Sequence, residues 1–326
     1  MHNESMQNTS WDAIIIGGGS GGLSAALMLV RARRRVLVVD SGASRNRFAA
    51  HMHGVIGRDG WSPLDLLATG RTEVQRYGGV VIPTEVVGVE RAVERADPGF
   101  DVTLGTGERH RARRLLIATG LRDELPDIPG LAEHWGSGVF VCPYCDGWEW
   151  RDRRIGVLAT GPMSPHQAQL LRQWSPEVTF LTNGAELADD TVAELTARGI
   201  VIEPRAVDGT STDADGRLSG IRLADGDTVA VDVIFLHPRV VPNDALLRGL
   251  GADTAPGHGG APWVEVDETG RTSVPGVWAV GNVVNPSASV PVASGAGNIA
   301  GATINADLIE EEIRVAVEET VLTPGG

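Results

Sequence analysis

The chain has two cysteines, Cys142 and Cys145, with Pro143 and Tyr144 between them and Asp146 directly after. In such a C-x-x-C pair the N-terminal thiol often has a lowered pKa, so its thiolate attacks a disulfide or another sulfur atom. The second thiol then resolves the mixed disulfide by closing the ring. The spacing therefore predicts a dithiol redox centre.

Three other interpretations of the two cysteines compete with this one. A zinc site needs about four ligands, but no second C-x-x-C and no histidine pair at zinc spacing accompanies the thiols. A structural disulfide across so small a loop would restrict the unfolded chain very little. Two inert core thiols are the third alternative, because free cysteine is often simply a small buried residue. The redox pair is favoured, and no metal site is expected.

Composition narrows the class of protein. With 326 residues, 42% of them apolar and 21% charged, the chain has the balance of a globular protein and room for two domains of about 100–200 residues each. The net charge of -14 argues against nucleic acid or an anionic membrane as partner, since both attract basic surfaces. A small-molecule dithiol or a disulfide carrier protein is the better expectation.

The uncharged stretch 13–30 is long enough to be mistaken for a membrane segment. It contains five glycines, and no Lys or Arg precedes it, whereas a signal peptide begins with positive charge. We therefore expect neither a signal nor an anchor, and a cytoplasmic protein. In that compartment a C-x-x-C pair is usually catalytic or redox-sensing.

The same stretch reads as a strand, a turn and a helix. Residues 13–16 form a short apolar run, 17–22 are glycine-rich, and 23–33 have helical character, followed by a second apolar run at 36–39. This is the G-x-G-x-x-G arrangement of a dinucleotide-binding fold.

Each residue type in this motif has a physical role. Gly17 permits the tight turn, Gly19 lets the backbone approach a pyrophosphate, and Gly22 lets helix and strand pack closely. The helix N-terminus favours the anion, and Asp40 follows the second strand, where it can accept from a ribose hydroxyl. The predicted cofactor-binding residues here are Gly17, Gly19, Ser20, Gly22 and Asp40.

Two later strands that end in small turns, at 115–120 and 276–282, complete the pattern. Together with the first motif they resemble the three FAD-contacting segments of the two-dinucleotide-binding flavoproteins. With the cysteines between them, nearly the whole chain resembles a low-molecular-weight thioredoxin reductase. The resemblance implies FAD as cofactor and a homodimer, and it adds these binding residues: Ala118, Thr119, Gly120, Gly281 and Asn282. The family usually has an aspartate at Asn282, whose carbonyl can still accept a hydrogen bond.

The resemblance also implies an α/β fold with two Rossmann-like dinucleotide-binding domains, one inserted into the other. We expect flexible residues 1–10, an FAD-binding domain at 11–121 and 254–316, an inserted NAD(P)H-domain-like module carrying the C-x-x-C at 122–253, and a tail at 317–326. Turn-forming residues place the linkers near 123–126 and 256–260.

The insert departs from the reductases. After the strand 154–158, Gly161 is the one glycine left in a degenerate fingerprint, Ala159 adds a Cβ at the turn, and Pro162 removes an N–H donor. After the strand 178–181 come Thr-Asn-Gly and then acidic residues, which would repel a 2′-phosphate: Glu186, Asp189 and Asp190. NAD(P)H is therefore a doubtful cofactor.

That loss resembles the thioredoxin reductase-like dithiol oxidases of the gliotoxin and holomycin type, as does the segment 45–54. These enzymes close a disulfide in a small molecule and pass electrons through the C-x-x-C and FAD to oxygen. The resemblance makes Cys142 the exchange thiol, Cys145 the flavin-proximal thiol and Asp146 the proton shuttle. Many oxidases of this branch carry histidine in place of Asp146.

Several assignments stay open. A thioredoxin reductase-type enzyme using NAD(P)H or ferredoxin, and a flavin redox sensor without turnover, are the alternatives to the oxidase. The nearby rings either line a substrate pocket or pack in the core: Tyr144, Trp148 and Trp150. His51 and His53 are either bases or flavin contacts, or have only structural roles.

Overall fold

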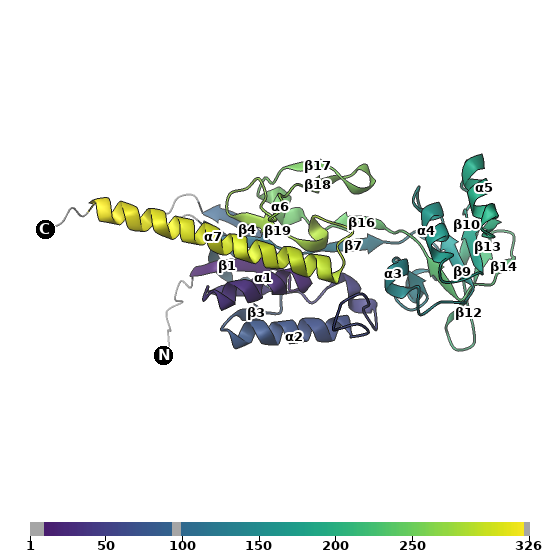
Figure 1. Cartoon of the computed structure of the whole chain (residues 1–326), viewed down its shortest axis with the longest axis horizontal. Helices are drawn as coiled ribbons and strands as arrows, with labels where there is room; N and C mark the ends of the chain where they lie inside the picture. Colours follow the sequence, from purple (N-terminus) through teal and green to yellow (C-terminus); the bar gives the residue numbers. More distant parts are fainter. Residues whose placement is uncertain (1–9, 93–98, 323–326) are drawn as a thin grey trace. The chain divides into compact units, whose positions relative to one another are not determined.

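The computed structural model describes residues 10–92 and 99–322, which form two compact units (Figure 1). The first unit consists of described residues in 10–45, 64–122 and 242–322, and the second of 46–63 and 123–241. Each unit is built on its own sheet, which is mixed in the first unit and parallel in the second. The prediction of an α/β fold with two Rossmann-like units is confirmed.

The first unit contains a 7-stranded sheet in the order β3-β2-β1-β6-β5-β4, with β19 also paired to β6. The predicted strands at 13–16 and 36–39 are present and pair in parallel, with Ile14 opposite Leu37. The strands are β1 (Ser10–Ile16), β2 (Val36–Val39), β3 (Val80–Ile82), β4 (Val86–Ala92), β5 (Gly99–Leu104), β6 (Arg109–Ile117) and β19 (Val277–Ala279).

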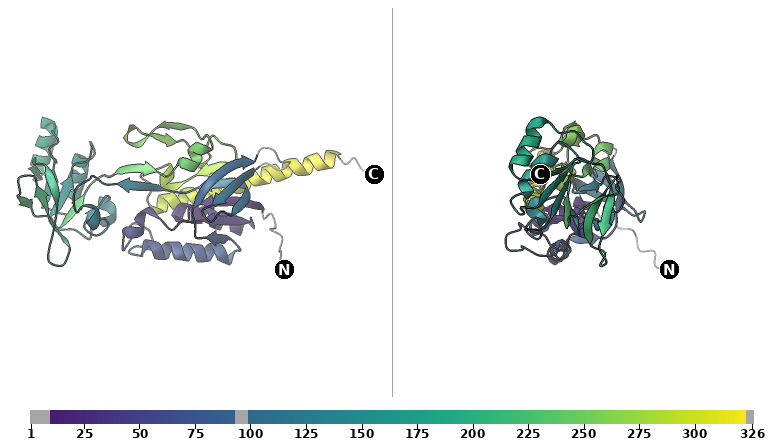
Figure 2. Two further views of the ribbon diagram at one scale, coloured as in Figure 1. Left: turned by 180° about the vertical axis from the view of Figure 1, so that it is seen from behind. Right: turned by 90° about the vertical axis from the view of Figure 1, so that its right-hand side faces the viewer.

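Both faces of this sheet are buried, which explains why its central strands are continuous apolar runs. Ala13 and Ile15 lie in one core with residues of α1 (Ser20–Arg31), α2 (Pro63–Arg76) and α7 (Val290–Leu322). Ile14 and Ile16 lie in the opposite core. In Figures 1 and 2 the last part of α7 extends beyond the sheet of its own unit.

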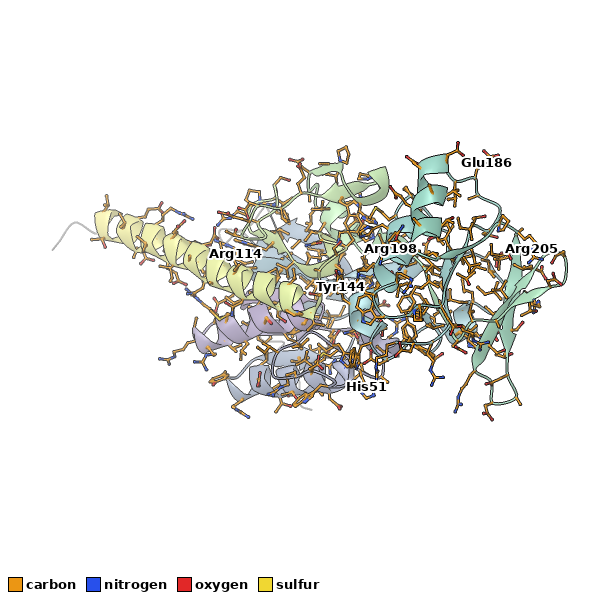
Figure 3. All side chains as sticks on the ribbon, turned by 45° about the vertical axis from the view of Figure 1, so that its right-hand side comes forward. His51, Arg114, Tyr144, Glu186, Arg198 and Arg205 are labelled. Carbon is orange, nitrogen blue, oxygen red and sulfur yellow. The ribbon has the colours of Figure 1, made fainter. Side chains whose placement is uncertain are left out.

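Helices α1 and α7 touch through their backbones. A Cβ on Gly297 would lie 2.0 Å from the carbonyl oxygen of Gly21, and one on Gly301 would lie 2.8 Å from that of Ala25. Ion pairs hold the next turns of α7 against β6. Arg114 bonds Asp307 and Glu311 (Figure 3), and the neighbouring Arg113 bonds Glu311 and Glu312.

The second unit, whose residues 123–241 are teal to green in Figure 2, has a 5-stranded parallel sheet in the order β11-β10-β9-β15-β8. Helices α4 and α5 bury one face of it, and the small antiparallel sheet β12-β13-β14 buries the other. The elements are β8 (Val139–Phe140), α3 (Pro143–Asp146), β9 (Ile155–Leu158), α4 (Ser164–Leu171), β10 (Val178–Leu181), α5 (Asp189–Ala197), β11 (Val201–Glu203), β12 (Val207–Thr212), β13 (Leu218–Leu223), β14 (Thr228–Val229) and β15 (Val233–Phe235).

Shorter elements complete the described chain: η1 (Arg45–Phe48), β7 (Leu121–Glu124), η2 (Ala132–His134), β16 (Arg239–Pro242), α6 (Ala245–Gly249), β17 (Thr254–Pro256), η3 (His258–Gly260), β18 (Pro262–Val264) and η4 (Gly281–Val283). The chain passes between the units within η1, at the start of α2, within β7 and within β16. Strands β7 and β16 pair with each other.

The unit boundaries differ from the predicted ones by one residue at Arg122, which groups with the first unit, and by longer segments in two other places. Residues 46–63 group with the second unit, and 242–253 group with the first. The turn-forming residues at 256–260 are not a linker, because they connect β17 to β18 in an antiparallel hairpin inside the first unit. Turn residues mark a change of chain direction, and a hairpin needs one as much as a linker does.

The predicted ends also shift. Of the predicted flexible residues 1–10, Ser10 already belongs to β1, and 1–9 lie outside the described residues. The predicted tail at 317–326 continues α7 as far as Leu322, and 323–326 lie outside the described residues. Within the described parts of the chain, none of the helices combines the length and the apolar character that crossing a bilayer requires.

The glycine contact between α1 and α7 yields a stability prediction. Gly297→Ala forces a Cβ onto a backbone carbonyl, so we expect a loss of about 1–3 kcal/mol and a lower Tm. Gly295→Ala, in the same helix, meets nothing within 4 Å and should be neutral or stabilising by about 0.4–1 kcal/mol. Thermal unfolding of both variants tests this, and equal Tm values for the two would contradict it.

Candidate active site

The two cysteines lie at the start of α3. Cys142 is the N-cap residue in an extended conformation, and its carbonyl accepts the N–H groups of Cys145 and Asp146, both at 3.1 Å. Pro143 occupies the first turn, where its missing N–H costs nothing. Both cysteines are partly buried thiols that are not joined in a disulfide. One helical turn thus brings them together, as the C-x-x-C spacing predicts.

The environment of Cys142 favours its thiolate. A hydrogen bond from the Cys145 thiol lowers the pKa of Cys142 to about 7, with burial opposing the shift. The N–H groups of Cys145 and Tyr144 stabilise the thiolate further, and the negative charge of Asp146 destabilises it. A substantial thiolate fraction is therefore present near neutral pH, as an exchange thiol requires.

Asp146 has the opposite shift. Burial raises its pKa to about 6, the neighbouring Glu149 carboxylate adds to the rise, and the positive charge of His53 opposes it. A carboxyl group with a pKa in this range can both take and give a proton near neutral pH. Asp146 therefore has the proton affinity that its predicted role as proton shuttle needs.

The aromatic residues around the cysteines divide into two groups. Trp150 packs on Phe140, with ring centroids 6.1 Å apart, so it belongs to the core. Tyr144 (Figure 3) and Trp148 are exposed by 75% and 64%. Tyr144 packs edge-to-face on Trp174, with ring centroids 5.9 Å apart. Sequence reasoning missed Trp174, which stands 30 positions further along the chain.

In the degenerate fingerprint after β9, a side chain of the same segment already bonds the backbone N–H groups. Ser164 is fully buried, and its hydroxyl oxygen accepts the N–H of Thr160 at 3.0 Å and of Gly161 at 3.3 Å. The same helix supports the active site, because Gln167 donates from Nε2 to the carbonyl of Val141 at 2.7 Å, directly before Cys142. Neither Ser164 nor Gln167 was singled out from the sequence.

The loop after β10 is also internally bonded. The Thr182 hydroxyl donates to the carbonyl of Pro204, and Asn183 accepts the N–H of Val207. Arg205, just after β11 (Figure 3), bonds three carboxylates: Glu203, Asp225 and Asp227. The predicted acidic residues Glu186, Asp189 and Asp190 are exposed. This end of the second sheet offers little to a 2′-phosphate.

In the first unit, the glycine motif leaves an open cradle at the start of α1. A Cβ on Gly17 would lie 2.3 Å from the carbonyl oxygen of Ala118, and one on Gly22 would lie 2.0 Å from that of Gly17. Gly19 has nothing within 4 Å, and no side chain caps the helix. With Ser20 in the first turn, uncapped N–H groups face open space, which suits a pyrophosphate.

Asp40 lies next to this cradle. Its carboxylate accepts the N–H of Gly42 at 3.1 Å and pairs with Arg71 at 3.0 Å. Each carboxylate oxygen can accept more than one hydrogen bond, so capacity remains for a ribose hydroxyl. Arg71 was not predicted, because it lies on α2, 31 positions away.

Residues far away in the sequence bond the segment after β6. Ala118 donates its N–H to Ile16 at 2.7 Å. Asn243 donates from its side chain to the carbonyl of Thr119, and its own carbonyl accepts the Thr119 hydroxyl at 2.7 Å. Gly120 has a positive φ of 69°. Asn243 is a further residue that the sequence did not reveal.

After β19, Gly281 turns the chain with φ of 75°. The two N–H donors of the Asn282 amide are shared among three carbonyls, those of Asn285, Pro286 and Ala288. An aspartate has no donor for these carbonyls, which explains the amide at this position. The arrangement leaves the Asn282 Oδ1 to act as acceptor.

These segments follow β1, β2, β6 and β19, which are neighbours in the sheet. The predicted cofactor residues therefore lie along one edge of the first unit, at the carboxyl ends of its strands, where open α/β sheets bind their ligands. The cradle, the uncapped helix and Asp40 fit a dinucleotide such as FAD.

The thiol environment yields a second prediction. Alkylation of reduced Cys142 by iodoacetamide should follow an apparent pKa near 7. Asp146→Asn removes a negative charge, so the profile should move to lower pH. In Cys145→Ala the hydrogen bond from the Cys145 thiol is lost, so the profile should move to higher pH. An upward shift in Asp146→Asn would contradict this account.

The bonds of Asn282 yield a third prediction. Asn282→Asp restores the residue usual in the family but places a carboxylate against three carbonyls. We expect reduced flavin content after purification and a lower Tm, because lone pairs would face lone pairs. Asn282→Ser, which keeps a donor, should lose less. An Asn282→Asp variant with full FAD content and unchanged Tm would show that these bonds contribute little.

Comparison with known proteins agrees with this geometry. The family model described as pyridine nucleotide-disulphide oxidoreductase matches residues 11–297. The chain is 34% identical over 311 residues to the thioredoxin reductase tcpT of Claviceps purpurea, covering 92% of this chain and 95% of the relative.

Two solved structures are also similar. The crystal structure of HlmI has a TM-score of 0.91 and 47% identity, covering 96% of this chain and 97% of that chain. An oxidoreductase from Agrobacterium tumefaciens has a TM-score of 0.85 and 38% identity, covering 92% and 99%. The chain therefore belongs to the pyridine nucleotide-disulphide oxidoreductase family, as an FAD-dependent, thioredoxin reductase-like disulfide oxidoreductase.

Proposed function

We propose that the protein is a dithiol oxidase, which closes a disulfide in a small-molecule dithiol and delivers the two electrons to oxygen. The observation that carries this proposal is the buried Ser164 hydroxyl, which accepts the N–H groups of Thr160 and Gly161. Those are donors that a nicotinamide dinucleotide would need for its pyrophosphate, and Pro162 supplies none. Electrons then enter from the dithiol instead of from NAD(P)H.

The exchange chemistry follows from the thiol environment. A substrate thiolate attacks Sγ of Cys142 in the oxidised pair, and the Cys145 thiolate leaves. The second substrate thiolate then attacks the substrate sulfur of the mixed disulfide, so the substrate S–S bond forms and the Cys142 thiolate leaves. The substrate has lost two electrons and two protons, and the cysteine pair has gained the electrons. The lowered pKa of Cys142 makes it the better leaving group.

Asp146 handles the protons. With its pKa raised to about 6 by burial first and Glu149 second, Asp146 is mainly a carboxylate at neutral pH. It can therefore accept the proton of an attacking substrate thiol and release it to solvent. As the pH falls through about 6, the carboxylate becomes protonated and this route closes.

The first unit would hold the cofactor through Gly17, Gly19, Ser20, Gly22 and Asp40 at one end, and through the segments at 118–120 and 281–282 at the other. The chemistry that bound FAD supplies is acceptance of two electrons from the cysteine pair and their transfer to oxygen. The residues of the chain bind and orient the cofactor.

A second candidate is a disulfide reductase of the thioredoxin reductase type, since the relative from Claviceps purpurea carries that name. NAD(P)H is disfavoured as its electron donor, because the N–H groups of the loop at 160–164 already bond the Ser164 hydroxyl. Ferredoxin would need no such loop.

The fourth prediction separates these functions. In an anaerobic titration, NADPH and NADH should leave the flavin absorbance unchanged, whereas dithiothreitol should bleach it. Air should then restore the colour with one peroxide formed per dithiol oxidised. Cys142→Ser and Cys145→Ser should each abolish the bleaching, because exchange needs both thiols.

Each other outcome has a definite meaning. Rapid bleaching by either nicotinamide would overturn the oxidase proposal in favour of a reductase. Bleaching by reduced ferredoxin with turnover of a protein disulfide would identify the ferredoxin-dependent alternative. Bleaching by dithiothreitol with very slow recovery in air would indicate a redox sensor.

A further inference from the structure

A histidine on the segment 46–63 faces the carboxylates beside the active site. His53 Nδ1 lies 3.3 Å from Asp59 Oδ2, and His53 Nε2 lies 3.4 Å from Glu149 Oε1. All three residues belong to the second unit. Because both ring nitrogens face carboxylate oxygens, the geometry suits an imidazolium, in which both nitrogens are donors.

The segment fixes this histidine in place. Asp59 is held by the N–H of Gly54 at 2.9 Å. On either side, Met52 exchanges backbone hydrogen bonds with Gly60 and Trp61, and its side chain is buried. The His53 side chain is only 25% exposed, so its position is set by the fold of the segment.

Glu149 connects this arrangement to the redox centre. It stands three positions after Asp146, just beyond the end of α3. Asp146 lies in the field of both charges: the negative charge of Glu149 raises its pKa, and the positive charge of His53 lowers it. The charged groups facing His53 are Asp59 from its own segment and Glu149 from the turn after α3, with Asp146 beyond.

We propose that His53 is a positioning residue for the thiol exchange, which acts through Glu149 by neutralising the carboxylate beside Asp146, so that Asp146 can give up its proton and accept another from the substrate thiol. This inference rests on the proposed function, because it assigns a further role in the same exchange step. Asp59 completes the arrangement by orienting the imidazolium.

The chemistry of the step sets the direction of each effect. The substrate thiol loses its proton to the Asp146 carboxylate, and the resulting thiolate attacks Cys142, with Cys145 leaving as a thiolate. Without the cation, Glu149 acts on Asp146 unopposed and the carboxylate holds its proton to higher pH. Without the negative charge of Glu149, Asp146 loses its proton at lower pH. The two substitutions must therefore act in opposite directions.

The test follows the exchange half-reaction without oxygen. Dithiothreitol is mixed anaerobically with the oxidised holoenzyme, and flavin bleaching is recorded from about pH 5 to 9, a range that includes the ordinary pKa of histidine. We expect the acidic limb of the wild-type profile near pH 6. It should move up by roughly one pH unit in His53→Gln and down by a similar amount in Glu149→Gln.

Two further variants make the test decisive. His53→Lys keeps the positive charge and should keep the limb near its wild-type position, which a merely structural role of the imidazole would not allow. His51→Gln is the matched control, because His51 is on the same segment and its Nδ1 bonds the backbone carbonyl of Gly60 at 3.0 Å. Its limb should stay in place.

Limbs that move in the same direction in His53→Gln and Glu149→Gln, or a limb that does not move in His53→Gln, would overturn the inference. Should His53→Gln fail to fold, Glu149→Gln and His53→Lys decide alone, since Glu149 is exposed. The half-reaction uses no oxygen, so a protein that is not reoxidised by air would refute the proposed function and still leave this result readable.

Discussion

Direct contact between backbones, with no room for a side chain, holds the cofactor-binding unit together. Gly17 lies against the carbonyl of Ala118, Gly22 against that of Gly17, and Gly297 against that of Gly21. These contacts bring β1, β6, α1 and α7 closer than any larger residue would permit. The open N-terminus of α1 and the strand ends beside it owe their places to this packing. About three to four turns further along α7, the ion pairs of Arg113 and Arg114 hold the helix in place.

The two units use the same strand-turn-helix plan with opposite results. After β1 the backbone N–H groups of the helix start have no side-chain partner, and Gly19 faces open space. After β9 the corresponding loop is satisfied by the hydroxyl of Ser164. A backbone donor that is already bonded gives a ligand little advantage, because each new hydrogen bond must replace an old one. The buried hydroxyl of Ser164 thus distinguishes the loop after β9 from the open start of α1.

Local patterns in the sequence predicted the strands and turns whose conformation depends on residues close together in the chain. The strands at 36–39 and 178–181, the C-x-x-C turn and the glycine turn lie where they were expected. What could not be predicted depends on contacts across many positions. Asn243 meets Thr119 across 124 positions, and Gly297 meets Gly21 from the other end of the chain. The turn residues at 256–260 were assigned to a linker because a hairpin and a linker require the same residue types. No periodic pattern in the sequence indicates that 46–63 group with the second unit or that His53 pairs with Glu149.

The three hydrogen bonds of Asn282 also bear on how the protein ages. Asparagine is among the thermolabile residues, because its side-chain carbonyl can be attacked by the next backbone nitrogen, with loss of ammonia. At position 282 the departing nitrogen is held by three carbonyls, and the chain is wound into η4. Both features keep the side chain away from the geometry that deamidation needs. The bonds that shape the turn after β19 thus also oppose the covalent change that would turn this amide into a carboxylate.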